Sequence, residues 1–124
     1  MARILIVDDD DQVRWTLGEI LRQKGYEVLE ADNGNVALRH LHGTPIDVVI
    51  TDIVMPEKEG IELIIEIKRD FPDLKIIAMS GGGRWGHNTY LDLAKKLKVA
   101  RTFEKPIDIN ELLSTLESLC EKDP

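Results

Sequence analysis

Three aspartates, a serine and a lysine stand where short apolar runs of this chain end. They are Asp8 and Asp9 after RILIV, Asp52 after VVIT, Ser80 at the end of KIIAMS, and Lys105 in FEKP. Carboxylates gathered away from water repel one another, so a group of three needs protonation or a cation. Such oxygens suit Mg²⁺, which typically takes one or two carboxylates together with phosphate oxygens. A lysine ammonium suits a carboxylate or a phosphoryl oxygen. These residue types together predict phosphoryl chemistry.

The charges of this set predict a site that accepts a phosphoryl group. Mg²⁺ and Lys105 together balance the three carboxylates, which leaves the site neutral. A carboxylate can attack phosphorus to give an aspartyl-phosphate, and the protein then has to position the groups and neutralise the transferring oxygens. In this scheme Asp52 is the nucleophile, and Asp8 and Asp9 hold the metal. Lys105 offsets phosphoryl charge, and Ser80 donates a hydrogen bond to a phosphoryl oxygen.

For these residues to meet, the strands that carry them must end at one edge of a sheet. Apolar, β-branched runs predict strands over residues 3–7, 26–31, 48–51, 75–80 and 100–103. Apolar residues at spacings of three and four predict helices over 11–24, 34–42, 61–70, 90–97 and 110–119. This alternation predicts an α/β, flavodoxin-like, doubly wound fold with a five-stranded parallel sheet (order 2-1-3-4-5) and five helices. Ligands of such sheets bind beyond the carboxyl ends of strands 1 and 3.

The other acids of the run VDDDD have a structural interpretation. Asp10 and Asp11 stand at the start of the first predicted helix, where negative charge is favourable beside the helix dipole. Gly25 is expected to end that helix, and Asp108 to cap the last one. The acidic run therefore divides into two carboxylates for chemistry and two for the helix.

The composition is that of a soluble globular chain. Its 124 residues fit one domain, 1–124, with 43% hydrophobic and 31% charged residues. A net charge of −7 argues against direct DNA binding, because proteins that track phosphates need a basic surface. The chain contains neither a membrane-length apolar run nor a secretory signal. Because Cys120 also has no second cysteine to pair with, we expect a cytoplasmic protein.

Four segments carry a resemblance to a known family. They are ILIVDDDD, TDIVMPEKEGIEL, IIAMSG and FEKPI, in this order and over essentially the whole chain. Together they resemble a bacterial response-regulator receiver domain. The resemblance implies that a histidine kinase or a phosphotransfer protein phosphorylates Asp52 in the presence of Mg²⁺. It also implies direct metal ligation by Asp9, Asp52 and the backbone carbonyl of Val54, with Asp8 acting mainly through water, and a cis peptide before Pro106.

Without an output domain, such a chain is expected to act through protein contacts, as a switch in a two-component system or phosphorelay. It would not be an enzyme beyond its own phosphoryl transfer and autodephosphorylation. We expect a monomer or a weak, phosphorylation-dependent dimer, with an unknown downstream target protein that binds the face of the fourth helix, fifth strand and fifth helix.

The chain departs from the family at positions that concern signalling. Thr102 replaces the aromatic residue that usually lies three positions before the lysine, and we expect the neighbouring Phe103 to pack in the core. Trp85 and Tyr90 lie in the glycine-rich segment 81–90, where we expect them to present a partner surface. Val54 offers no group to assist an attacking water, which predicts slow to moderate self-dephosphorylation.

Two alternatives use different residues. A Mg²⁺-dependent phosphatase of the haloacid-dehalogenase type would use Asp8 as its nucleophile, although the threonine of that family's motif is absent. A flavodoxin shares the fold, but its first loop must cradle a phosphate, which four carboxylates would repel.

Overall fold

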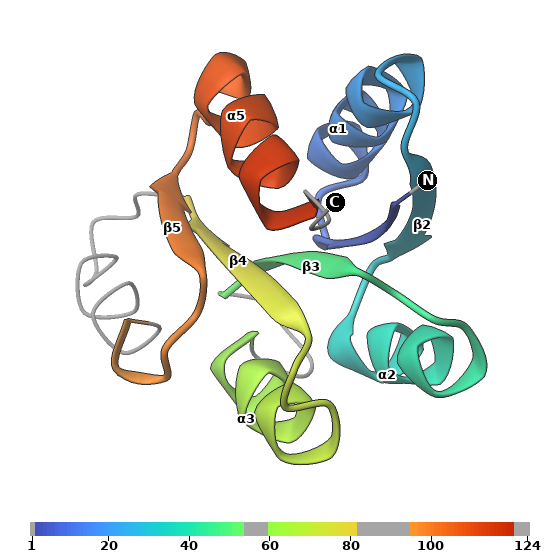
Figure 1. Ribbon diagram of the computed structural model, residues 1–124, viewed down its shortest axis with the longest axis vertical. Helices are drawn as coiled ribbons and strands as arrows, with labels where there is room; N and C mark the ends of the chain where they lie inside the picture. The colour runs from blue at the N-terminus through green and yellow to red at the C-terminus, as the bar shows by residue number, and fades with distance from the viewer. Residues whose placement is uncertain (1, 54–59, 82–94, 121–124) are drawn as a thin grey trace.

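Five parallel strands form one sheet in the order β2-β1-β3-β4-β5 (Figure 1). The computed structural model describes residues 2–53, 60–81 and 95–120. The strands are β1 (Arg3–Val7), β2 (Glu27–Ala31), β3 (Val48–Asp52), β4 (Lys75–Ser80) and β5 (Arg101–Glu104). Their order confirms the flavodoxin-like prediction, and every predicted strand boundary is within one residue of the observed one.

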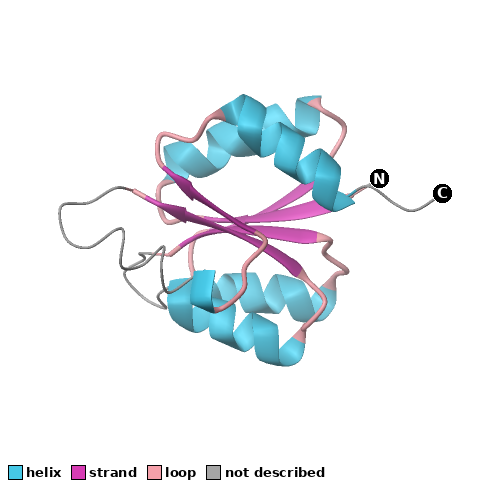
Figure 2. Ribbon diagram, turned by 60° about the vertical axis from the view of Figure 1, so that its left-hand side comes forward, coloured by secondary structure: helices cyan, strands magenta, loops and turns pink. Residues whose placement is uncertain are grey.

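Helices cover both faces of this sheet (Figure 2). They are α1 (Asp11–Gln23), α2 (Gly34–Gly43), α3 (Gly60–Asp70) and α5 (Ile109–Cys120). The side chains of α1 and α5 pack against one face, and those of α2 and α3 against the other. The prediction of five helices is therefore not met by the described residues, which contain four. Most of the remaining predicted helix, 90–97, falls on residues 82–94, outside the described part of the chain.

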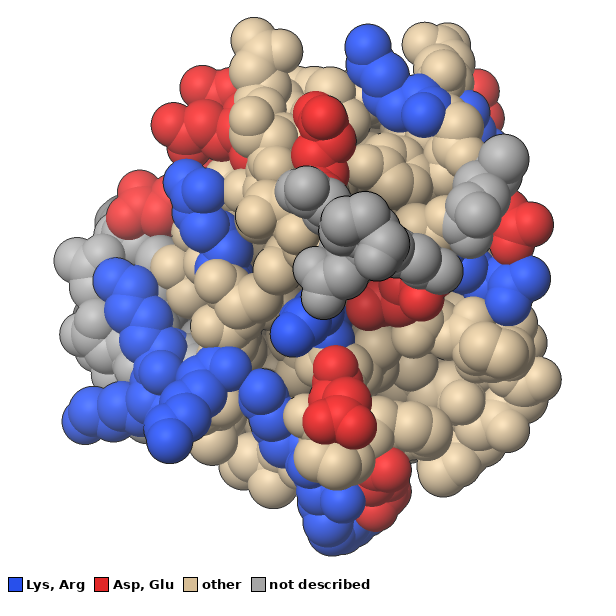
Figure 3. All heavy atoms as spheres, in the orientation of Figure 1, with Lys and Arg blue, Asp and Glu red and all other residues tan. Residues whose placement is uncertain are grey.

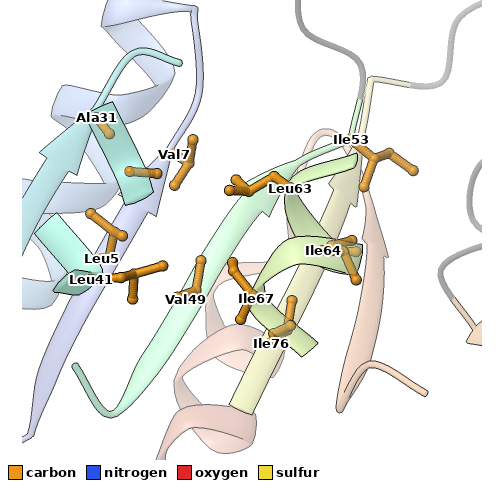
Figure 4. Close-up of a cluster of buried hydrophobic side chains, with 12 residues drawn as sticks. Leu5, Val7, Ala31, Leu41, Val49, Ile53, Leu63, Ile64, Ile67 and Ile76 are labelled. Atoms are coloured by element: carbon orange, nitrogen blue, oxygen red, sulfur yellow. The ribbon is translucent and has the colours of Figure 1, made fainter. Parts of the chain in front are cut away.

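The two faces have separate cores because successive strand residues point to opposite sides. Ile4 and Ile6 contribute to the core under α1 and α5, whereas Leu5 and Val7 contribute to the other. Figure 4 shows this second core, in which side chains of β1, β3 and β4 meet Leu63, Ile64 and Ile67 of α3. All four of these β1 side chains are fully buried. The sheet is therefore fixed from both sides, which holds its carboxyl edge in place.

The residues at the ends of α1 and α5 have the roles that the sequence predicts. Asp10 caps α1, with its carboxylate accepting from the backbone N–H groups of Gln12 and Val13. Gly25 follows α1 with a φ of 95°, a left-handed conformation that favours glycine. The Asp108 carboxylate accepts from the backbone N–H of Glu111 at 3.1 Å. The structural interpretations of Asp10, Gly25 and Asp108 are therefore confirmed.

The surface charge is uneven. In Figure 3, Lys and Arg side chains gather toward the lower left of the view, while Asp and Glu lie elsewhere on this face. The prediction against DNA binding rests on the net charge of −7 and stays a prediction. No helix in the described ranges has both the length and the apolar character that crossing a membrane requires.

Candidate functional site

The strand register brings the predicted site residues to one edge of the sheet. Val7 of β1 lies beside Thr51 of β3, so the next residue of each strand, Asp8 and Asp52, reaches the same end. The backbone N–H of Lys105 donates to the Ser80 carbonyl at 2.8 Å, which places the end of β5 beside the end of β4. The predicted convergence is therefore present.

Asp8 is a fully buried carboxylate with two donors. Its Oδ2 accepts from Lys105 Nζ at 2.7 Å, and its Oδ1 accepts from the backbone N–H of Asp10 at 2.9 Å. A buried charge is costly unless it is paired and hydrogen-bonded. Asp8 meets both conditions, and its position is determined by the lysine and by the turn that starts α1.

Lys105 connects the carboxylates of β1 and β3. Its Nζ also lies 3.4 Å from Asp52 Oδ2, and the Asp52 side chain is only 8% exposed. Burial by itself would lower the pKa of Lys105, but the hydrogen bond to Asp8 and the charges of Asp52 and Asp8 outweigh burial and raise it. Lys105 is therefore a fixed positive charge between two carboxylates.

Asp8, Asp9 and Asp52 form one acidic cluster. Each offers a carboxylate oxygen, and these oxygens lie within 4.8 Å of one another. Asp9 is the exposed member, and within the described part of the chain no hydrogen bond or ion pair occupies its carboxylate. Lys105 neutralises only one of the three charges. An oxygen-only set with residual negative charge fits Mg²⁺.

The Ser80 hydroxyl is a second feature, besides the acidic cluster, that fits a bound ligand. Its Oγ is buried and has no hydrogen-bond partner among the described residues. An unpaired buried hydroxyl costs about 1–3 kcal/mol, so each such group needs an explanation. At the carboxyl end of β4, beside the acidic cluster, a phosphoryl oxygen would supply the missing acceptor.

Gly60 is a residue whose role at the site the sequence analysis missed. A Cβ there would lie 2.3 Å from the Asp52 carbonyl oxygen and 2.3 Å from the Ile53 Cα. Only glycine lets the start of α3 pack this closely on the backbone that carries Asp52. The segment alone gave no signal for this contact, because it arises from the packing of α3 against the end of β3.

The remaining predicted residues fall into two groups. Thr102 is half-buried and pairs in register with Ala78, whereas Phe103 is buried in the core on the α1 and α5 side, as expected. The Lys105–Pro106 peptide is cis, which confirms that expectation. Val54, Trp85 and Tyr90 lie outside the described residues.

Comparisons with known proteins agree on one family. The model of the response regulator receiver domain matches residues 4–117. The response regulator receiver protein CpdR of Brucella abortus is 36% identical over 96% of this chain and 97% of its own length. Sporulation initiation phosphotransferase F of Bacillus subtilis is 32% identical over 89% of this chain and 86% of its own length.

A solved structure of similar extent carries a ligand. The response regulator TrrA of Thermotoga maritima, in complex with Mg²⁺-BeF, has a TM-score of 0.81 and 32% identity, and the match covers 96% of this chain and 99% of that one. Other relatives are longer, and the chain spans only 24% of the DNA-binding transcriptional regulator NtrC of Azospirillum brasilense. The comparisons lend no support to the phosphatase alternative.

Proposed function

Because the chain belongs to the response regulator receiver domains of two-component signalling, we propose that it accepts a phosphoryl group on Asp52. The observation that carries this proposal is the convergence of the Asp52 carboxylate, Lys105 Nζ and the acidic cluster at one sheet edge. Receiver domains are signalling switches rather than classical enzymes. A histidine kinase or a phosphotransfer protein is the proposed donor, and the signal passes on through protein contacts.

In the proposed transfer, an Asp52 carboxylate oxygen forms a bond to phosphorus while the bond from phosphorus to the donor's nitrogen breaks. Lys105 offsets charge on the transferring oxygens, and the Ser80 hydroxyl donates to one of them. Asp9, Asp52 and the Val54 carbonyl would hold Mg²⁺, with Asp8 acting mainly through water. When bound, Mg²⁺ supplies charge neutralisation for the phosphoryl oxygens.

Labelling with radioactive acetyl phosphate tests this proposal. In the presence of Mg²⁺ we expect one hydroxylamine-labile phosphoryl group per chain. In EDTA the extent of labelling should decrease by roughly tenfold or more, because the acidic cluster then repels the phosphoryl donor. Continuous release of phosphate with no stable label would contradict the proposal and favour a phosphatase. A purified chain without visible absorbance would argue against bound flavin.

Replacing Ser80 with alanine separates function from stability. Because the buried hydroxyl has no partner among the described residues, its removal should raise the free energy of unfolding by about 1–3 kcal/mol. The labelling rate should nevertheless decrease by about a hundredfold, since one donor to the phosphoryl group is lost. Chemical denaturation and labelling time courses measure the two effects. An unchanged rate would remove Ser80 from the proposed site.

The proposal extends to features that rest on the sequence. Trp85 and Tyr90 would present the partner surface, Thr102 would replace the usual aromatic switch, and Val54 would leave self-dephosphorylation slow to moderate. We propose that residues 1–124 act as a single cytoplasmic domain, as a monomer or a weak phosphorylation-dependent dimer. The downstream target is a protein of unknown identity, bound on the side of β5 and α5.

A further inference from the structure

Arg14 of α1 contacts three parts of the structure from a largely buried position. Its side chain is 16% exposed. Nη1 donates to the Asp8 carbonyl oxygen at 2.7 Å, Nη2 donates to Asp11 Oδ1, and Nε lies 3.3 Å from Glu30 Oε1 on β2. One guanidinium thus joins the first turn of α1, the end of β1 and the neighbouring strand.

The contact with the Asp8 carbonyl concerns the metal site. That oxygen belongs to the peptide unit that links Asp8 to Asp9, so Arg14 fixes the plane of the peptide from which Asp9 begins. The other acids of the run have protein partners: Asp8 pairs with Lys105, Asp10 caps the helix, and Asp11 pairs with Arg14. Asp9 has none in the described ranges and is held only through its backbone.

We propose that Arg14 is a positioning residue for the Mg²⁺ site. It acts through the peptide that precedes Asp9, and it touches neither the metal nor the phosphoryl group. This inference rests on the proposed function, because it requires the acidic cluster to bind Mg²⁺. The fixed fork of a guanidinium holds the carbonyl and both carboxylates at once, which the single ammonium of lysine does not reproduce.

Arg22 provides a matched control on the same helix. Its Nη2 lies 3.0 Å from Glu30 Oε2, so it pairs with the carboxylate that Arg14 also contacts. The contacts of Arg22 are with Glu19, Val28 and Glu30, none of which is part of the acidic cluster. Substituting methionine for either arginine removes an ion pair with Glu30, but only Arg14→Met releases the peptide before Asp9.

Calorimetric titration of the unphosphorylated chain with Mg²⁺ tests the inference. We expect Arg14→Met and Arg14→Lys to raise the Kd for Mg²⁺ by about tenfold, which is the lower end of the range for residues that orient metal ligands. Arg22→Met should retain the wild-type Kd. Charge alone predicts the opposite sign for Arg14→Met, because losing a cation near carboxylates strengthens binding of Mg²⁺.

Three results would overturn the inference, and they have different consequences. Arg14→Lys keeps the charge and is the milder of the two substitutions. If this variant binds Mg²⁺ with the wild-type Kd, the guanidinium does not position the metal site. An equal loss in Arg22→Met would assign the effect to general stability. A wild-type chain that binds no Mg²⁺ would refute the proposed metal site, and the inference with it.

Discussion

Replacing Asp52 with asparagine should abolish phosphoryl labelling by acetyl phosphate, to less than about 1% of the wild-type level. An amide is a poor nucleophile toward phosphorus, and no other group can replace a covalent attachment point. Folding should survive, because asparagine has nearly the same shape in a side chain that is 8% exposed. Removing one of three clustered carboxylates should also raise the free energy of unfolding in EDTA, since the remaining charges repel less.

Asp8→Asn is the comparison that separates the two nucleophiles. Asp8 is fully buried and bonded to Lys105, so its oxygens are less available for attack than those of Asp52. We expect Asp8→Asn to label slowly and with a weaker dependence on Mg²⁺, but to label at Asp52. Mass spectrometry of the borohydride-reduced chain locates the modified residue. Full labelling of Asp52→Asn together with none in Asp8→Asn would reverse the assignment and support the phosphatase alternative.

The convergence of Asp8, Asp52, Ser80 and Lys105 was predictable from the sequence because it follows from the order of the strands in the sheet. Once β1, β3, β4 and β5 are parallel and in a known order, the last residue of each strand must lie at one edge. Asp8, Asp52 and Ser80 were predicted in this way, without any knowledge of side-chain contacts. The division of the acidic run also followed from local rules, since an aspartate beside a helix start caps it.

The features that the sequence missed depend on packing between distant elements. Gly60 is needed because α3 approaches the backbone of Asp52, and nothing in its own segment indicates that approach. In the sequence, Arg14 is an ordinary charged residue on the face of a predicted helix. In the structure, it donates a hydrogen bond to the Asp8 carbonyl and forms an ion pair with Glu30 of β2. Such contacts depend on where helices sit on the sheet, and hydrophobic periodicity does not determine this to within a hydrogen-bond length.

Replacing Lys105 with methionine should destabilise the chain in EDTA by about 3 kcal/mol and reduce labelling by about a hundredfold or more. Removing one partner of a buried ion pair costs about 3–5 kcal/mol, and the lower end applies because the Lys105 side chain is 19% exposed. Among the described residues, the variant would leave the buried Asp8 carboxylate with only the Asp10 N–H as a donor. The matched exposed substitution, Lys75→Met, should change stability by less than about 0.5 kcal/mol.

Two conditions should reduce the stability difference between wild type and Lys105→Met. Mg²⁺ should reduce it, because a cation among the carboxylates replaces part of the charge that lysine supplied. High pH should reduce it as well, because the folded-state pKa of Lys105 is raised by Asp8 and Asp52 despite its burial. The contribution of Lys105 is then complete below the unfolded-state pKa, about 10.4, and is lost as the pH rises through the folded-state value. If the difference in unfolding free energy changed with neither Mg²⁺ nor pH, Lys105 would stabilise the fold by packing. That result would contradict its role as the positive charge of the site.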